Sequence, residues 1–194
     1  MSTSYLSAAK AQFNYYKSLG DKTISRLNEE QLHWQPGPES NSIATIVKHM
    51  VGNMHSRWTD FLNTDGEKDF RNREDEFTAE VISKNLVIEQ WNTGWQVLFS
   101  ALDEVESLGP EGLEQTIYIR NMGHTVTEAI NRQLCHYSYH VGQMTFVGRM
   151  MLADKWESLS IPKGESVRYN EKTFAKGKRK EHFTEEWLEE KKDD

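Results

Sequence analysis

Apolar residues recur every three or four positions over four long stretches of the chain, which is typical of amphipathic helices. The stretches are residues 4–28, about 42–64, 78–107 and 125–152. Turn-forming proline and glycine interrupt the pattern at 36–38 and again at 109–110. The pattern therefore predicts an all-α protein, and long helices joined by one long crossover predict a four-helix bundle.

The segments between and after these helices carry other patterns. Residues 115–120 and 124–126 are rich in β-branched side chains and flank an Asn/Gly-containing turn at 121–123, which predicts a short β-like hairpin before the last helix. Most residues of 67–76 are charged, so we expect an exposed loop there. Residues 171–194 are dense in both charges and predict a charged C-terminal tail after a bundle domain of residues 1–170.

Composition narrows the classes of partner and compartment. The formal net charge of −7 argues against a nucleic-acid partner, because phosphate binding requires a basic patch. No run of about 18 apolar residues exists, so no membrane span is expected, and the first residues lack the pattern of a signal peptide. The single cysteine, Cys135, excludes an intramolecular disulfide, and we interpret it as a small core residue. Together these features indicate a cytoplasmic protein.

The residues with most chemical potential lie in the sequence CHYSYHVGQ, residues 135–143. His136 and His140 are one helical turn apart on the same face, close enough to bind one ion. At about 100° per residue, both lie at roughly 240–280° from Ile130, beside the apolar stripe of their helix. His49 lies at roughly 240° from Ile43 on its own helix, so all three histidines border an apolar seam with the same rotational sense.

Two semi-polar stripes include these histidines. One stripe is Ile46, His49, Asn53 and Arg57, and the other is Gln133, His136, His140, Gln143 and Val147. If the stripes face each other, the bundle encloses a pocket with three imidazoles at one end. Neutral imidazole is a favoured ligand of zinc and nickel, so the three histidines form a candidate metal site. The alternative is that each is a hydrogen-bonded residue at the border of the core. Asn53, Arg57 and Gln143 are candidates to orient a substrate.

Three segments together resemble the DinB-like superfamily of metal-binding four-helix bundles, in an uncharacterised branch common in Bacillus-type bacteria. They are SIATIVKHMVGNMHSRWTDFLNTDGEK at 42–68, AINRQLCHYSYHVGQM at 129–144 and ESLSIPKGESVRYN at 157–170, and the resemblance covers residues 4–170. It implies a divalent ion, most often zinc or nickel, on His49, His136 and His140, with a water or substrate completing its shell. Relatives include transferases and isomerases that use mycothiol or bacillithiol, and metal-dependent hydrolases. Many members form homodimers.

These observations leave three hypotheses for function. The first is a metal-dependent enzyme, either a hydrolase or a bacillithiol-type thiol transferase, because three neutral ligands leave an ion an open position. Its substrate would be a low-molecular-weight thiol or another small molecule, and no catalytic residue beyond the ligands can be assigned. The sequence places no obvious carboxylate near the ligands as a general base, which keeps a second hypothesis open, a non-catalytic metal- or small-molecule-binding protein. The third is a dimeric helical protein in which the histidines satisfy one another without metal.

Overall fold

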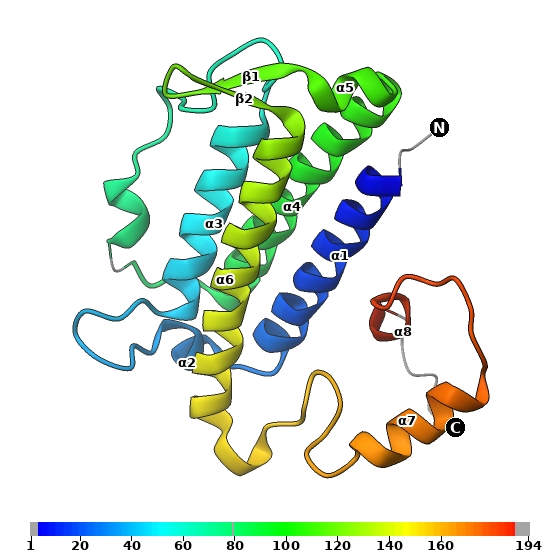
Figure 1. The fold of residues 1–194 in the computed structure, drawn as a ribbon. Coiled ribbons are helices and arrows are strands. Elements are labelled where there is room, and N and C mark those ends of the chain that lie inside the picture. Colours follow the sequence, from blue (N-terminus) through cyan, green and yellow to red (C-terminus); the bar gives the residue numbers. More distant parts are fainter. Residues whose placement is uncertain (1–3, 79, 189–194) are drawn as a thin grey trace.

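The computed structural model describes residues 4–78 and 80–188, and four long helices dominate it (Figure 1). They are α1 (Ser4–Ser25), α3 (Ile43–Trp58), α4 (Lys84–Ser107) and α6 (Val126–Leu152). Helix α1 packs mainly against α6 and α4, and α3 packs mainly against α4 and α6, so the four helices close into a bundle. The all-α fold class with a short hairpin before the last long helix is confirmed.

The direction of the helices explains the long connection between the second and third of them. Helices α1 and α6 run one way along the bundle, and α3 and α4 run the other way (Figure 1). Because α3 and α4 are parallel neighbours, the chain between them, residues 59–83, must return along the length of the bundle. We call this segment the crossover. It carries a short 3₁₀ helix, η1 (Glu74–Phe77), which packs against α3.

Aromatic side chains lock the bundle helices together in the core. The rings of Phe13 on α1 and Trp95 on α4 lie 6.2 Å apart between centroids. Tyr137 on α6 lies 5.8 Å from the same Trp95 ring. All three side chains are fully buried. Edge-on contacts of this kind add to simple burial and fix how each helix is rotated about its own axis.

Side-chain caps mark the starts of α3, α4 and α6, but the apolar pattern did not locate every helix boundary. Ser42 caps α3 by accepting a hydrogen bond from the backbone N–H of Thr45. The helix that we expected to reach about residue 64 ends at Trp58, because Asp60 takes a left-handed backbone with φ 45°. The predicted helix from residue 78 begins only at Lys84, after its Ser83 cap.

The first long helix ends earlier than predicted, and the last long helix begins where it was predicted. The predicted first helix ends at Ser25, and a separate short helix, α2 (Glu29–His33), follows with Asn28 as its cap. A capping box of Thr125 and Glu128 opens α6, in agreement with the predicted start at residue 125.

The hairpin pairs β1 (Thr116–Ile119) with β2 (Met122–Thr125), after the short helix α5 (Pro110–Glu114). Its turn is formed by Arg120 and Asn121, both left-handed at φ 55° and 60°, one residue earlier than the turn that we expected. Two consecutive left-handed residues are what a tight two-residue hairpin requires. The carboxylate of Asp65 accepts both of their backbone N–H groups at 2.8 Å, which anchors the turn to the crossover.

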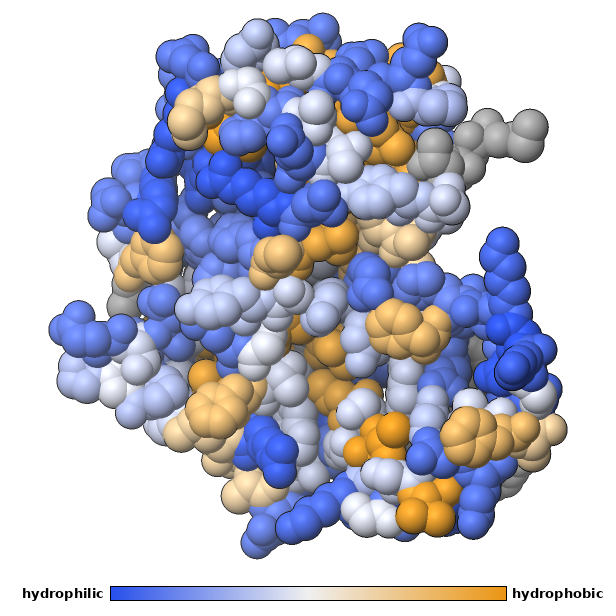
Figure 2. Space-filling view, in the orientation of Figure 1, coloured by the Kyte–Doolittle hydropathy of each residue, from blue (hydrophilic) through white to orange (hydrophobic). Residues whose placement is uncertain are grey.

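The chain after α6 forms η2 (Ala153–Lys155), α7 (Ser166–Ala175) and α8 (Glu185–Leu188), and α8 contacts α1. On the face shown in Figure 2, hydrophilic residues cover most of the bundle, and apolar residues gather on the C-terminal segment at lower right. None of the helices in the described ranges is long and apolar enough to cross a membrane. Cys135 is exposed, so its interpretation as a core residue was wrong. It lies on the solvent face of α6, which it shares with Arg132 and Tyr139.

Candidate metal centre

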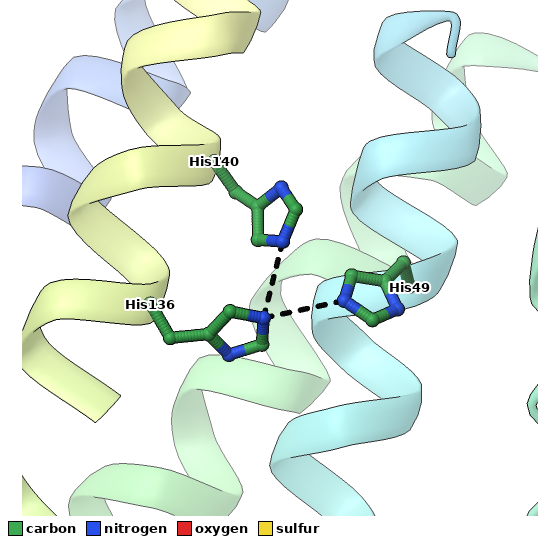
Figure 3. Close-up of side chains that lie close together, drawn as sticks. All are labelled: His49, His136 and His140. Atoms are coloured by element: carbon green, nitrogen blue, oxygen red, sulfur yellow. Dashed lines mark hydrogen bonds between the residues drawn. The ribbon is translucent and has the colours of Figure 1, made fainter. Parts of the chain in front are cut away.

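Three histidine side chains from two helices converge on one point of the bundle (Figure 3). His49 projects from α3, and His136 and His140 project from adjacent turns of α6. The Nε2 atom of His136 lies 3.3 Å from that of His49 and 3.1 Å from that of His140. One nitrogen of each ring therefore faces the same small volume, and the two predicted stripes do face each other at this level.

The second ring nitrogen of each histidine has its own partner, and each partner atom is an oxygen. Nδ1 lies 2.9 Å from Glu76 Oε2 for His49, 3.2 Å from Gln133 Oε1 for His136, and 2.8 Å from Gln143 Oε1 for His140. Since these oxygens accept hydrogen bonds, each Nδ1 carries the ring proton and donates it. Each Nε2 is then left with a lone pair that points toward the other two histidines.

Glu76 is held in place by an ion pair as well as by His49. Arg71 donates from Nε and Nη2 to the two carboxylate oxygens at 2.7 and 3.0 Å. Both side chains are buried, Arg71 at 3% and Glu76 at 6% exposure. Burial raises the pKa of Glu76, but hydrogen bonds from His49 and Arg71 outweigh it, so the pKa lies below its usual value. Glu76 is therefore an ionised carboxylate that accepts on both oxygens.

The crossover reaches α3 at a position without a side chain. A Cβ atom on Gly52 would lie 2.2 Å from Oε1 of Glu76, so any larger residue there would displace the carboxylate. Gly52 is three residues after His49, hence one turn along the same face of α3. The expectation that residues 67–76 form an exposed loop was wrong at Glu76, which the sequence analysis missed as part of the site.

The protonation state of the histidines suits a ligand set. Burial lowers the pKa of His136 to about 3, and repulsion from His140 and His49 acts in the same direction. The pKa of His140 is also lowered, chiefly by burial. Metal ions bind the neutral imidazole, so both residues are held in the form that can coordinate.

Aromatic side chains flank the centre at the surface of the bundle. The ring of Phe77 lies 5.1 Å from that of His49, and the ring of Tyr139 lies 5.0 Å from that of His140. Phe77 is 37% exposed and Tyr139 is 62% exposed. The side chain of Gln143 joins these two residues, because it accepts from His140 Nδ1 and donates to the Tyr139 hydroxyl at 3.0 Å. The centre therefore lies near solvent and not in the middle of the core.

Of the residues expected to orient a substrate, Gln143 alone contacts these histidines. Asn53 accepts a hydrogen bond from the buried Tyr137 hydroxyl at 3.0 Å. Arg57 donates to the backbone carbonyl of Gly66 and lies 3.3 Å from Glu67. Asn53 therefore links α3 to α6, and Arg57 links α3 to the crossover. The helical wheel gave the face on which these residues lie, but it could not give their neighbours.

Comparison with known proteins identifies a family for the chain. The model of a family described as "Protein of unknown function (DUF1572)" matches residues 1–165, a range that includes the three histidines, Arg71 and Glu76. No curated protein and no solved structure matches the chain.

Proposed function

The chain belongs to this family of unknown function, and we propose that it is a metal-dependent enzyme whose divalent ion is bound by His49, His136 and His140. One observation carries the proposal. Three Nε2 atoms face one another, and each Nδ1 has an oxygen as its partner, which favours the tautomer with the proton on Nδ1. Lone pairs that point at each other across about 3 Å repel, and a cation between them turns that repulsion into attraction.

The donor set fits such an ion. Zinc binds imidazole nitrogen at about 2.0–2.1 Å in tetrahedral geometry, which separates two ligand nitrogens by roughly 3.3 Å. The separations from His136 to the other two histidines are 3.3 and 3.1 Å. Three neutral nitrogen ligands favour zinc or nickel over calcium or magnesium, which prefer oxygen. Zinc and nickel are therefore the ions that we propose.

The surrounding residues match the outer shell of a metal site. A ligating histidine usually donates its other N–H to a carboxylate or carbonyl oxygen, which fixes the ring and makes it more basic. Glu76 supplies a carboxylate to His49, and two glutamine side chains supply amide oxygens to His136 and His140. Arg71 in turn fixes Glu76, so the His49 ring is oriented before an ion arrives.

The exposed side of the centre and the lack beside it, among the described residues, of a carboxylate free to act as a base support a choice of reaction class. When bound, the ion would supply a Lewis acid there, which promotes both hydrolysis and the ionisation of a thiol. Glu76 does not act as a general base, because its two oxygens are taken by Arg71 and His49. A thiol needs less help from a protein base than water does, since its pKa is about 8.5. We therefore favour transfer of a low-molecular-weight thiol, with hydrolysis second.

The resemblance to the DinB-like superfamily supports the same proposal. That superfamily includes bacillithiol- and mycothiol-dependent enzymes with a histidine on the second long helix and a His-x-x-x-His pair on the last, the arrangement of His49, His136 and His140 here. We propose that the chain is a member. Homodimer formation, which the resemblance implies, and a cytoplasmic location, which the composition indicates, remain predictions.

The first experiment measures metal content. Protein purified without an affinity tag should carry a stoichiometric divalent ion by mass spectrometry, and a His136→Ala/His140→Ala variant should carry none. His55→Ala is the matched control, because His55 lies on α3 but faces α4, in a groove that it shares with Thr93 and Gln96. An ion retained by the double variant, or absent from the native protein under zinc and nickel supplementation, would contradict the proposal.

The second experiment separates the enzyme from a passive metal-binding protein. The metal-loaded protein is assayed for transfer of bacillithiol to a set of small electrophiles, and for hydrolysis of activated esters and amides. We expect turnover in the first assay that is lost in the double histidine variant. Bound metal with no turnover in either assay would leave the non-catalytic alternative.

A further inference from the structure

A pocket of about 400 Å³ opens between α3, α6 and the loop that precedes α3. This volume lies within the range of sites for small ligands, about 300–1,000 Å³. Its floor is formed by Ile46 and Val147, which are 3% and 6% exposed. Phe146 and Met150 form an apolar wall, and both are largely exposed at 65% and 48%. An apolar surface of this kind is open to a ligand and is not covered by the fold.

The pocket adjoins the candidate metal centre through one shared side chain, Gln143. Gln143 lines it, and the same side chain accepts the hydrogen bond from His140 Nδ1 at 2.8 Å. Ile46 lies three residues before His49 on α3, which is about one turn, or roughly 5 Å, along the helix. Because α3 and α6 are antiparallel, both helices lead from the histidines to the same place (Figure 1). The pocket therefore lies beside the centre, about one helical turn away along α3.

The charges around the pocket select against an anion. Among the lining residues that the structure describes, Glu39 is the only charged one, and no lysine or arginine is present. The other polar groups, among them Ser40 and Asn41, lie where the loop meets the groove. An acidic group beside an apolar floor repels a carboxylate or phosphate and accepts a neutral chain.

We infer that this pocket binds an uncharged, apolar chain of the substrate, of the length of a medium alkyl or acyl group, while the reacting atom lies at the three histidines. The inference rests on the proposed function for the position of the reacting atom. It does not depend on the metal for the binding of the chain, since none of the pocket residues is a candidate ligand. The apolar partner of the reaction, and not an anionic thiol, is thus the molecule that this pocket recognises.

The test uses simple probes on the full-length protein, with and without zinc. The methyl signals of Ile46, Val147 and Met150 are followed by NMR during titration with 1-hexanol, 1-octanol and octanoate. We expect 1-octanol to shift these signals and to bind roughly 15-fold more tightly than 1-hexanol, because each added methylene contributes about fourfold. Octanoate should bind more weakly than 1-octanol to the metal-free protein.

A matched pair of variants ties the effect to the pocket. Met150→Glu places a charge on the pocket wall at a position exposed enough to leave the fold intact, and it should weaken 1-octanol binding about fourfold or more. Met122→Glu makes the same change on β2, where Met122 is 59% exposed and outside the pocket, and it should leave binding unchanged.

The outcomes separate this inference from the proposed function. Zinc binding without any shift of the pocket methyl groups, or equal affinity for both alcohols, overturns the pocket and leaves the metal centre standing. Shifts that persist without zinc, in a protein that binds no metal, support the pocket and reject the metal-dependent enzyme. Tighter binding of octanoate than of 1-octanol by the metal-free protein would show that the ligand is an anion and refute the inference.

Discussion

Nδ1 of His49 and a carboxylate oxygen of Glu76 lie 2.9 Å apart, although 27 positions separate the two residues in the chain. The bond joins a bundle helix to the crossover, so the orientation of one candidate ligand depends on how a connecting segment docks. Arg71 lies in the same crossover and holds the second oxygen of Glu76. Outer partners of this kind typically change metal affinity by 10–100-fold when they are removed.

Gly52→Ala tests this dependence without replacing a ligand or its partner. The added Cβ would lie 2.2 Å from Oε1 of Glu76, and the easiest relief is movement of that carboxylate away from His49. We expect metal affinity to fall by about 10–100-fold in a chelator-competition assay. The helical circular dichroism signal should be unchanged, because alanine favours a helix more than glycine does.

Gly142→Ala is the control, since Gly142 lies on α6 next to Val141 and a Cβ there meets nothing within 4 Å. This variant shares the gain in helix propensity and should keep the native metal affinity. If both variants bind metal equally well, the docking of Glu76 does not tune the centre.

Replacing Glu76 should also destabilise the metal-free fold, because its partner is buried. Glu76→Gln leaves the guanidinium of Arg71, at 3% exposure, without its counter-charge. Removing one member of a buried ion pair costs about 3–5 kcal/mol. The double variant Arg71→Met/Glu76→Gln removes both charges and should be more stable than Glu76→Gln alone. Urea unfolding of the native protein, both single variants and the double variant measures the coupling, and additive losses would mean that the pair is not coupled.

The sequence was sufficient for the features that repeat or are local. Helical spacing of apolar residues located the four bundle helices, and the predicted starts near residues 42 and 125 agree with the observed caps of α3 and α6. The rotational position of His49, His136 and His140 placed each of them at the border of the core, because that face is a property of each helix alone. That their stripes face each other was only a condition in the sequence, and the structure meets it.

The features that depend on tertiary neighbours were out of reach. Glu76 lies in a run of charges without helix or strand periodicity, and only its docking against Gly52 and Arg71 makes it a buried group. Arg57 shares the histidine face of α3, yet its neighbour is the Gly66 carbonyl of the crossover, which no helical wheel contains. The end of α3 and the start of α4 were misplaced for the same reason, since the route of the crossover decides both.

The anchor of the hairpin turn predicts a dependence of stability on pH. Asp65 accepts backbone N–H groups from Asn121, Glu67 and Arg120, and these bonds, led by that of Asn121, lower its pKa. A folded-state pKa below the unfolded one means that the ionised group stabilises the fold above the unfolded value. That contribution is lost as the pH falls through the folded-state pKa.

Asp65→Asn should therefore cost about 1 kcal/mol or less at pH 7, since the site is partly solvated, and the difference from the native protein should shrink toward pH 3. Asp69→Asn, at an exposed position of the same crossover, is the control and should change little at either pH. Unfolding in urea at the two pH values gives the comparison. A difference that stays constant between pH 7 and pH 3 would mean that the charge of Asp65 is not what stabilises the turn.

Removal of the metal should leave the bundle folded. The ring contacts of Trp95 with Phe13 and Tyr137 lie in the core and involve none of the candidate ligands, so the helices keep their packing without an ion. The ligand rings are also held by Glu76, Gln133 and Gln143 in the absence of an ion. We therefore expect the same helical circular dichroism signal with and without a chelator, unlike a zinc finger, which unfolds when its ion is removed.

Zinc should still raise the melting temperature, because a ligand that binds only the native state stabilises it by mass action. At a free ion concentration of 100 times Kd the gain is about 2.7 kcal/mol, which corresponds to a shift of roughly 5–10 °C for a chain of this size. The His136→Ala/His140→Ala variant should melt at the same temperature with and without zinc. A native protein whose helical signal collapses on chelation would have a structural ion, and an ion needed to hold the fold together is poorly suited to an open position for substrate.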